Sequence, residues 1–272
     1  MRPRLPLLAL LVSSLLPSPA SAQATAVANQ RLVGVINPIG AEHMVSAGLR
    51  APLGLPDGIL YSDTHIELGP VSYVSPIYAR TGGYLQLQPL AVLILRAEVR
   101  HVAMWSLDMP GAGYVPVEPG RGQGQAGEAL GWEAQFSAIV QGMVPLGPVQ
   151  LLLWDQVGYE RIHLGVAPRY LSPRHDTELA REDGVMSNSA MLLGQVELSE
   201  GWSLRVGAYD DVAYVPSSDT LIHQVGPIAA LSISRPADGV AEVMPLLRAG
   251  YYTDGRREGA WTGLAGVMIS YR

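Results

Sequence analysis

The sequence predicts an all-β fold, an antiparallel up-and-down β-barrel that crosses a membrane with about ten strands. Segments along the whole chain alternate apolar and polar residues with a period of two, which is typical of strands with two different faces. The connections between these segments alternate in length, and several short ones carry Pro or Gly. After residue 22 no apolar stretch reaches the roughly 18 residues that a membrane-spanning helix needs. If the chain enters a membrane, it does so as strands.

The N-terminus has the pattern of a secretory signal peptide. Arg2 and Arg4 precede the apolar residues 5–16, and Ala20, Ser21 and Ala22 form a small-residue cleavage site. The apolar run is too short to span a bilayer. We therefore expect residues 1–22 to be a cleaved signal peptide and residues 23–272 to be a single barrel domain.

Composition excludes several classes of function. Acidic residues outnumber basic ones by 24 to 18, for a net charge of −6, which argues against a nucleic-acid partner. Cysteine is absent, so an exported chain of this size is not held by disulfides. Six scattered His residues without Cys offer no metal-ligand spacing, and the Gly-rich residues 120–127 lack the Lys and following helix of a phosphate-binding loop. No metal or cofactor is expected.

Residues 90–105 show the two-faced pattern most clearly. Their odd positions are apolar except for His101, whereas the even positions include Arg96, Glu98 and Arg100. A further strand begins near residue 149. The other segments that alternate in this way are 132–144, 190–198, 202–215, 222–234, 241–253 and 260–272.

The strand count before residue 90 has two solutions. With residues 43–52 as the first strand, running outward, and one strand within 61–88, the count is ten. Residues 61–88 are long for one strand and are broken at Ser75 and Pro76. With residues 61–88 divided there into two strands and residues 31–37 as an extra first strand, the count is twelve.

Loop lengths and the signal peptide together give the chain its resemblance to a family. Short turns at 145–148, 199–201 and 235–240 alternate with longer connections at 106–128, 165–189, 216–221 and 254–259. The mature chain resembles small outer-membrane β-barrel proteins of Gram-negative bacteria over essentially its whole length. The resemblance implies a location in the cell outer membrane, contact with membrane lipid and lipopolysaccharide, and insertion by the barrel-assembly machinery. Such barrels usually end in an aromatic residue, whereas here Tyr271 is penultimate and Arg272 is last. The oligomeric state stays open.

Aromatic residues on the apolar faces cluster at strand ends, where amphipathic rings prefer the headgroup depth of a membrane. The predicted girdle consists of Trp105, Trp132, Tyr159, Tyr214, Tyr251 and Trp261 at the outer rim, and Trp202 and Tyr271 at the inner rim. His101, Asp155 and Asp210 also fall on apolar faces. For Asp155 we expect a bulge near Trp154 that turns the carboxylate inward.

The polar faces would line the interior of the barrel. The predicted lumen-lining set is Arg96, Glu98, Arg100, Glu133, Glu160, Glu197, Arg205, Asp211, Glu242 and Arg248. Because a ten-stranded barrel is narrow, we expect these opposed charges to form a bonded internal network. The favoured function is a structural barrel or a small, constricted pore.

Two alternatives remain open from sequence. One is a rim enzyme, a protease or lipid hydrolase, with the weak catalytic candidates His175, Asp176, Asp210 and Asp211. Neighbouring residues of a strand point to opposite faces and no Ser-containing nucleophile elbow is present, so an enzyme is the less favoured interpretation. The other is a soluble periplasmic β-barrel carrier, which would need its apolar face inside. Trp residues at strand ends argue against this carrier.

Overall fold

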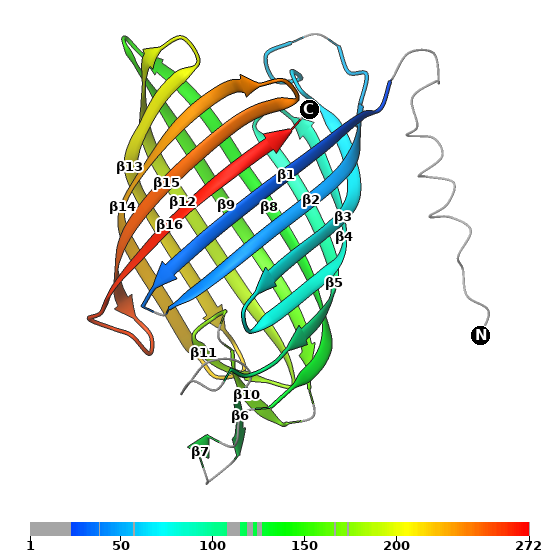
Figure 1. The fold of residues 1–272 in the computed structure, drawn as a ribbon, viewed down its shortest axis with the longest axis vertical. Coiled ribbons are helices and arrows are strands. Elements are labelled where there is room, and N and C mark those ends of the chain that lie inside the picture. Colours follow the sequence, from blue (N-terminus) through cyan, green and yellow to red (C-terminus); the bar gives the residue numbers. More distant parts are fainter. Residues whose placement is uncertain are drawn as a thin grey trace, which may run out of the picture.

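Twelve antiparallel strands close into a barrel in the computed structural model (Figure 1). The structure describes residues 23–271 except 38, 57, 108–114, 119–121, 124–126, 166 and 173. The expected signal peptide, residues 1–22, and the terminal Arg272 lie outside the described residues. Around the barrel the strands follow one another in chain order, and β1 pairs with β16 to close the ring.

The strands of the barrel are β1 (Thr25–Ile36), β2 (Gly40–Pro52), β3 (His65–Ser75), β4 (Tyr78–Leu90), β5 (Leu93–Met104), β8 (Ala129–Leu146), β9 (Val149–Leu164), β12 (Glu182–Ser199), β13 (Trp202–Val215), β14 (Thr220–Ala237), β15 (Val240–Asp254) and β16 (Trp261–Tyr271). The higher of the two predicted counts is therefore the observed one. Residues 61–88 hold two strands, β3 and β4, with the break at Pro76. As a result β2, which contains residues 43–52, runs opposite to the direction that the ten-strand count gave it.

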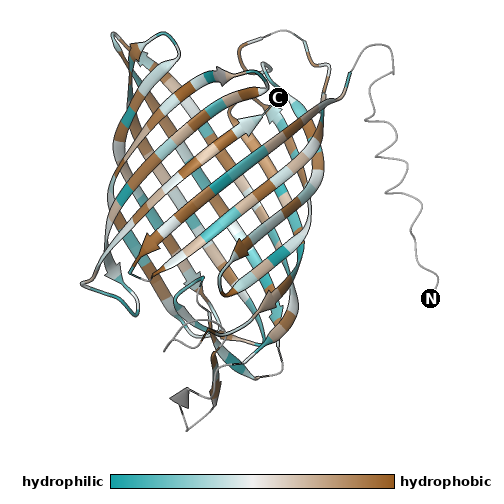
Figure 2. Ribbon diagram, viewed as in Figure 1, coloured by the Kyte–Doolittle hydropathy of each residue, from teal (hydrophilic) through white to brown (hydrophobic). Residues whose placement is uncertain are grey.

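Each strand has one face inside the barrel and one face outside, as the period of two predicts. In β5, Glu98, Arg100 and Val102 are buried, whereas Val99 and His101 are exposed on the outside. The outer face is apolar: Val99 is 64% exposed and Phe136 is 53% exposed. Figure 2 shows the resulting alternation of hydrophobic and hydrophilic bands along the strands.

The two ends of the barrel differ. β1 begins and β16 ends at the same end of the barrel, called here the terminal end, and the opposite end is called the loop end (Figure 1). Three of the tight turns at the terminal end contain Gly147, Gly201 and Gly239, each with a positive φ that side chains rarely tolerate. Residues 53–64, between β2 and β3, form a longer connection at this end, so the alternation of loop lengths is not strict.

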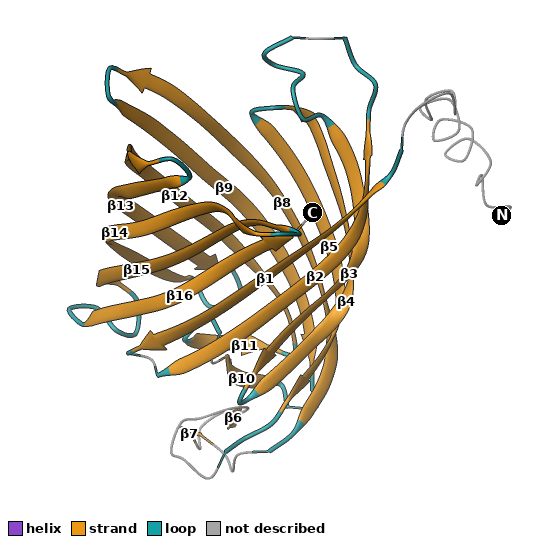
Figure 3. Cartoon of the chain, turned by 45° about the horizontal axis from the view of Figure 1, so that its top comes forward, coloured by secondary structure: helices purple, strands orange, loops and turns teal. Residues whose placement is uncertain are grey.

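The two longest connections pair with each other at the loop end. They contribute a small sheet with the order β11-β10-β6-β7, built from β6 (Val115–Glu118), β7 (Gly122–Gln123), β10 (Arg169–Ser172) and β11 (Thr177–Ala180). Figure 3 shows β10 and β11 at the lower end of the barrel, with β6 and β7 below them. Tyr170 and Leu179 are fully buried in a cluster with Val102, Leu164 and Val215 of the barrel strands. These connections were expected as loops, because their Gly- and Pro-rich sequences have no strand period.

The expected bulge at Trp154 is wrong. The pairing of β9 with β8 and with β12 continues through residues 154 and 155 without a shift of register. Asp155 therefore stays on the outer face, where its Oδ1 accepts a hydrogen bond from Nδ2 of Asn188 at 2.6 Å. A neighbouring amide, not an inward turn, satisfies this carboxylate.

Among the described residues, no helix is long and apolar enough to cross a membrane.

Candidate functional site

Glu133 is the centre of an ion-pair network inside the barrel near the loop end. Its side chain projects from β8 and is only 3% exposed. Nη1 of Arg80 lies 3.0 Å from Oε1, and Nη1 of Arg174 lies 3.5 Å from Oε2. Arg100, on the adjacent strand β5, also contacts this carboxylate through its Nε. Three guanidinium groups thus share one buried carboxylate.

The network continues around the wall toward β1. Nη2 of Arg80 donates to Oε2 of Glu42 at 2.6 Å, and the hydroxyl of Tyr78 donates to the same oxygen at 2.7 Å. Arg31 binds the other oxygen of Glu42 at 3.0 Å. Residues of β1, β2, β4 and β8 are therefore tied together along one wall of the lumen by charge-assisted hydrogen bonds.

A second part of the network lies deeper in the barrel. Glu98 binds Arg100 and also accepts from Nε of Arg96 at 2.6 Å. The Tyr73 hydroxyl donates to Glu98 at 3.2 Å, while the guanidinium of Arg80 stacks on the Tyr73 ring at 4.2 Å from its centroid. Such cation–π contacts hold charged side chains flat against the wall.

The opposite wall is less charged. Arg248 pairs with Asp211 and lies over the ring of Tyr209, 3.5 Å from its centroid. Arg205 donates to Oε1 of Glu242 at 3.3 Å. The inward positions of β1, β15 and β16 are otherwise mainly apolar and partly exposed to the lumen; they include Val33, Leu246, Leu264 and Met268. The lumen thus has one densely charged wall and one mostly apolar wall.

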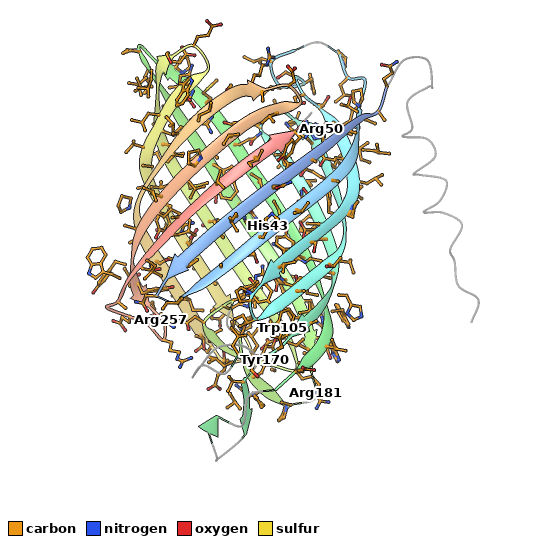
Figure 4. All side chains as sticks on the ribbon, in the orientation of Figure 1. His43, Arg50, Trp105, Tyr170, Arg181 and Arg257 are labelled. Carbon is orange, nitrogen blue, oxygen red and sulfur yellow. The ribbon has the colours of Figure 1, made fainter. Side chains whose placement is uncertain are left out.

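The turn between β10 and β11 reaches into the mouth of the barrel. Nη1 of Arg174 donates to both oxygens of Glu160, at 2.6 and 2.5 Å. On the far side, Asp176 is held by Arg257, with Nη2 to Oδ1 at 3.2 Å. Arg257 also donates to Oδ1 of Asn37, at 2.6 Å. Because β9, which carries Glu160, and β16, which follows Arg257, are five places apart in a ring of twelve, this hairpin spans the mouth. Figure 4 labels Arg257 and Tyr170 at this end.

His175 is buried beside Arg174 in the same turn. Burial lowers the pKa of this imidazole well below its usual value, and the charge of Arg174 acts in the same direction. By contrast, Glu160 and Glu133 outweigh the effect of burial on Arg174 and raise its pKa. Nδ1 of His175 lies 3.0 Å from the Ser172 hydroxyl. The space left beneath the hairpin is about 10 Å³, enough for one water molecule.

Comparisons with known proteins bear on the fold. No protein-family description matches the sequence, and no curated protein matches it. Among solved structures, the β-domain of the Bordetella autotransporter BrkA is similar at a TM-score of 0.51 and 10% identity, covering 92% of this chain and 100% of that one. The translocator domain of the autotransporter NalP from Neisseria meningitidis gives 0.43 and 12%, covering 97% and 93%. The NanC porin gives 0.41 and 7%, covering 90% and 99%.

The chain has the fold of Gram-negative outer-membrane β-barrels. Among the described residues, the twelve-stranded ring has no unpaired strand edge, and its exposed apolar outer face fits a lipid environment. These two properties fit a barrel that spans a lipid bilayer. They also argue against the soluble carrier, which would need the apolar face inside.

In the barrel, nine of the ten predicted lumen residues take part in the contacts above. Glu197 has the parity of an inward position but lies exposed at the terminal end. Sequence reasoning missed Glu42, Arg80 and Arg174. Glu42 and Arg80 lie on the polar parity of β2 and β4, so a correct division of residues 61–88 could have found Arg80. Arg174 lies in a connection without a period, and nothing in the sequence marked it.

The four weak catalytic candidates are not brought together. His175 and Asp176 belong to the hairpin turn and bind different partners. Asp211 faces the lumen and pairs with Arg248. Asp210 is on the outer face, where its Oδ2 lies 3.1 Å from Nε2 of His223. Among the described residues, no three His, Asp or Glu side chains form a group that could hold a metal ion.

The predicted girdle residues lie near the two ends of the barrel. Five of them are well exposed on the outer face: Trp132, Tyr159, Trp202, Tyr251 and Trp261. Nε1 of Trp105 donates to the carbonyl of Pro76 at 2.6 Å, and the Tyr214 hydroxyl donates to Asp219 at 2.9 Å. Tyr271 is half-buried at the end of β16, paired with Ala28 of β1.

Proposed function

We propose that this barrel is a constricted outer-membrane pore that the β10–β11 hairpin holds closed at the loop end. The observation that carries the proposal is the attachment of this hairpin to opposite sides of the mouth. Arg174 binds Glu160 and Glu133 on one side, and Asp176 binds Arg257 on the other. A segment that served only as a surface loop would not need anchors on both sides.

The width of the barrel supports a passage behind this closure. Side chains alone fill a barrel of about eight strands, and larger rings leave space for a ligand or a channel. In this ring of twelve, the ion pairs gather along the wall from β1 to β9. The charged wall would then set the preference of the pore for ions or small polar solutes.

The orientation follows from the strand count. An even number of strands leaves both termini on one side, and a chain exported through a signal peptide at residues 1–22 enters the outer membrane from the periplasm. We therefore assign the terminal end to the periplasm and the loop end to the cell exterior. The hairpin and the exposed aromatic rings at this end would contact lipopolysaccharide.

Single-channel recording in planar lipid bilayers tests the proposal. The informative variant is Arg257→Ala, which removes one anchor of the hairpin and leaves the buried network around Glu133 intact. Its neighbour Arg256→Ala is the matched control, because Arg256 is exposed in the same loop. We expect rare, small openings for the wild type and the control, and a several-fold higher open probability for Arg257→Ala.

Two outcomes would contradict the pore. A wild type that is already fully open would show that the hairpin does not close the lumen. Absence of openings in Arg257→Ala, and also after replacing residues 169–180 with a short Gly-Ser linker, would favour a purely structural barrel.

A further inference from the structure

Three polar side chains meet on the outer face of β13, β14 and β15, away from the lumen. Oδ2 of Asp210 lies 3.1 Å from Nε2 of His223, and Nδ1 of His223 lies 2.5 Å from Oγ1 of Thr253. The Asp210 side chain is 48% exposed and that of His223 is 30% exposed. The cluster is therefore open to whatever surrounds the barrel.

The contacts fit one tautomer of a neutral His223 beside a carboxylate, with the Thr253 hydroxyl also 3.5 Å from the His223 carbonyl oxygen. An ionised carboxylate can only accept, so Nε2 of His223 carries the hydrogen that Asp210 receives. Nδ1 is then an unprotonated acceptor, and the Thr253 hydroxyl donates to it. An Asp that orients a His, whose other nitrogen accepts from a hydroxyl, is the arrangement that activates an oxygen nucleophile.

A β-bulge places Thr253 in this position. His223 pairs with Asp254 and the next residue, Gln224, pairs with Tyr252, so Thr253 is the extra residue between them. Bulges re-aim side chains and are frequent at barrel rims and beside active sites. Asp254 does not compete for the imidazole, because its Oδ1 accepts from the backbone N–H of Gly255 at 2.6 Å.

The depth of the cluster matches that of lipid ester groups. Asp210 pairs with Val225, and Val225 pairs on its other side with Tyr251. Tyr251 packs edge-on against Trp261, with ring centroids 5.3 Å apart, and both rings are exposed. Exposed Trp and Tyr mark the headgroup region of a membrane, so the cluster lies beside the layer in which acyl esters of lipids are found.

We propose that Thr253, His223 and Asp210 form a catalytic site that hydrolyses acyl esters of membrane lipids. Oγ1 of Thr253 attacks the ester carbonyl carbon while its proton passes to Nδ1 of His223. The bond to the alkoxy oxygen breaks, and the proton on Nδ1 moves to the leaving alcohol. Water, deprotonated by the same nitrogen, then attacks the acyl carbonyl carbon, the bond from that carbon to Oγ1 breaks, and the proton on Nδ1 returns to Oγ1, which releases a fatty acid and restores Thr253 and the neutral imidazole. Asp210 keeps the imidazole in the required tautomer and stabilises its charged form.

The test uses the full barrel, folded in detergent and mixed with phospholipid micelles, with fatty-acid release as the readout. We expect Thr253→Val and His223→Gln to lower the rate on the order of 10²- to 10⁴-fold, the usual effect of removing a general base or its nucleophile. Thr81→Val is the matched control, since Thr81 is an exposed Thr whose hydroxyl lies 3.0 Å from that of Ser72. This control should retain the wild-type rate.

A second readout separates catalysis from a structural role. A fluorophosphonate probe should attach to Thr253 in the wild type, as mapped by mass spectrometry, and should not attach to this residue in His223→Gln. Each variant is first shown to be folded by its heat-dependent shift on a detergent gel. If folded wild type releases no more fatty acid than folded Thr253→Val, or if Thr253 is never labelled, the proposal is overturned. Bilayer conductance of Thr253→Val should equal that of the wild type, so a failed pore leaves this test unaffected.

Discussion

Replacing Glu133 with Gln should be among the most destabilising single changes in the barrel. Three guanidinium groups face its carboxylate, from Arg80, Arg100 and Arg174. The side chain is 3% exposed, so water cannot replace the lost charge. Breaking a buried ion pair by removing one partner costs about 3 to 5 kcal/mol, because the remaining charge stays buried without compensation. Glu42, Glu98 and Glu160 each retain a contact with one of the three cations, which keeps our expectation at about 3 to 4 kcal/mol.

The assay is urea unfolding of the refolded barrel, followed by tryptophan fluorescence. With a slope of about 3 kcal/mol per molar urea, the loss corresponds to a midpoint about 1 M lower. Glu197→Gln is the control, because Glu197 is an exposed carboxylate on the same inward parity; surface changes of this kind stay within about 0.5 kcal/mol. Equal midpoints for the two variants would refute the reasoning that Glu133 organises the network.

Two further predictions concern the closure and the packing of the lumen. The pKa of His175 is lowered in the closed hairpin, whereas a His in water titrates near 6.5. The closed state is therefore fully stable above pH 6.5 and loses stability as the pH falls below it, so channel openings should increase between pH 7 and 5. The groups around His175 are Ser172, Arg174, Glu160, Glu133, Arg80 and Asp183. Because several carboxylates are among them, His175→Phe is the deciding variant, and an unchanged pH response in it would exclude His175 as the sensor. Separately, Gly250→Val should lower the free energy of unfolding by about 1 to 3 kcal/mol, because a Cβ at this position meets the Tyr209 hydroxyl. The control is Gly142→Val, which has open space around its Cβ and should unfold at the same urea concentration as the wild type.

The period-two pattern predicted the strands well because a barrel strand meets two uniform environments. Lipid selects one face along its whole length and the lumen selects the other, so β5, β8, β13, β15 and β16 could be found one by one from sequence. The early strands were harder to divide. In residues 61–88 the side chains of Tyr73, Tyr78 and Tyr84 face the lumen. Because these aromatic rings lie on the polar face, the two faces differ less in polarity than they do in the later strands.

The candidate site was predictable only in part, because parity gives the side of a residue but not its partner. The inward position of Glu133 follows from alternation, whereas its contact with Arg174 depends on a hairpin residue 41 positions further along the chain. Similarly, Asp210 was recognised as an unusual outward charge. Its partner His223 is 13 positions away, on the next strand. Thr253 reaches His223 because of a β-bulge, which no residue pattern in the sequence predicted.

The pairing of β1 with β16 closes the ring and is called here the seam. It differs from every other strand pairing of the barrel in the sequence separation of its residues. All other neighbouring strands are successive along the chain and can form as hairpins, but at the seam Thr262 donates to the carbonyl of Ile36, 226 positions away. Contacts of such long separation are the slow ones in folding, because the intervening chain must be ordered before they form. Until the last strand is in place, both β1 and β16 present unpaired backbone groups, which lipid cannot satisfy. The barrel therefore remains an open sheet with two unpaired edges until β16 pairs with β1.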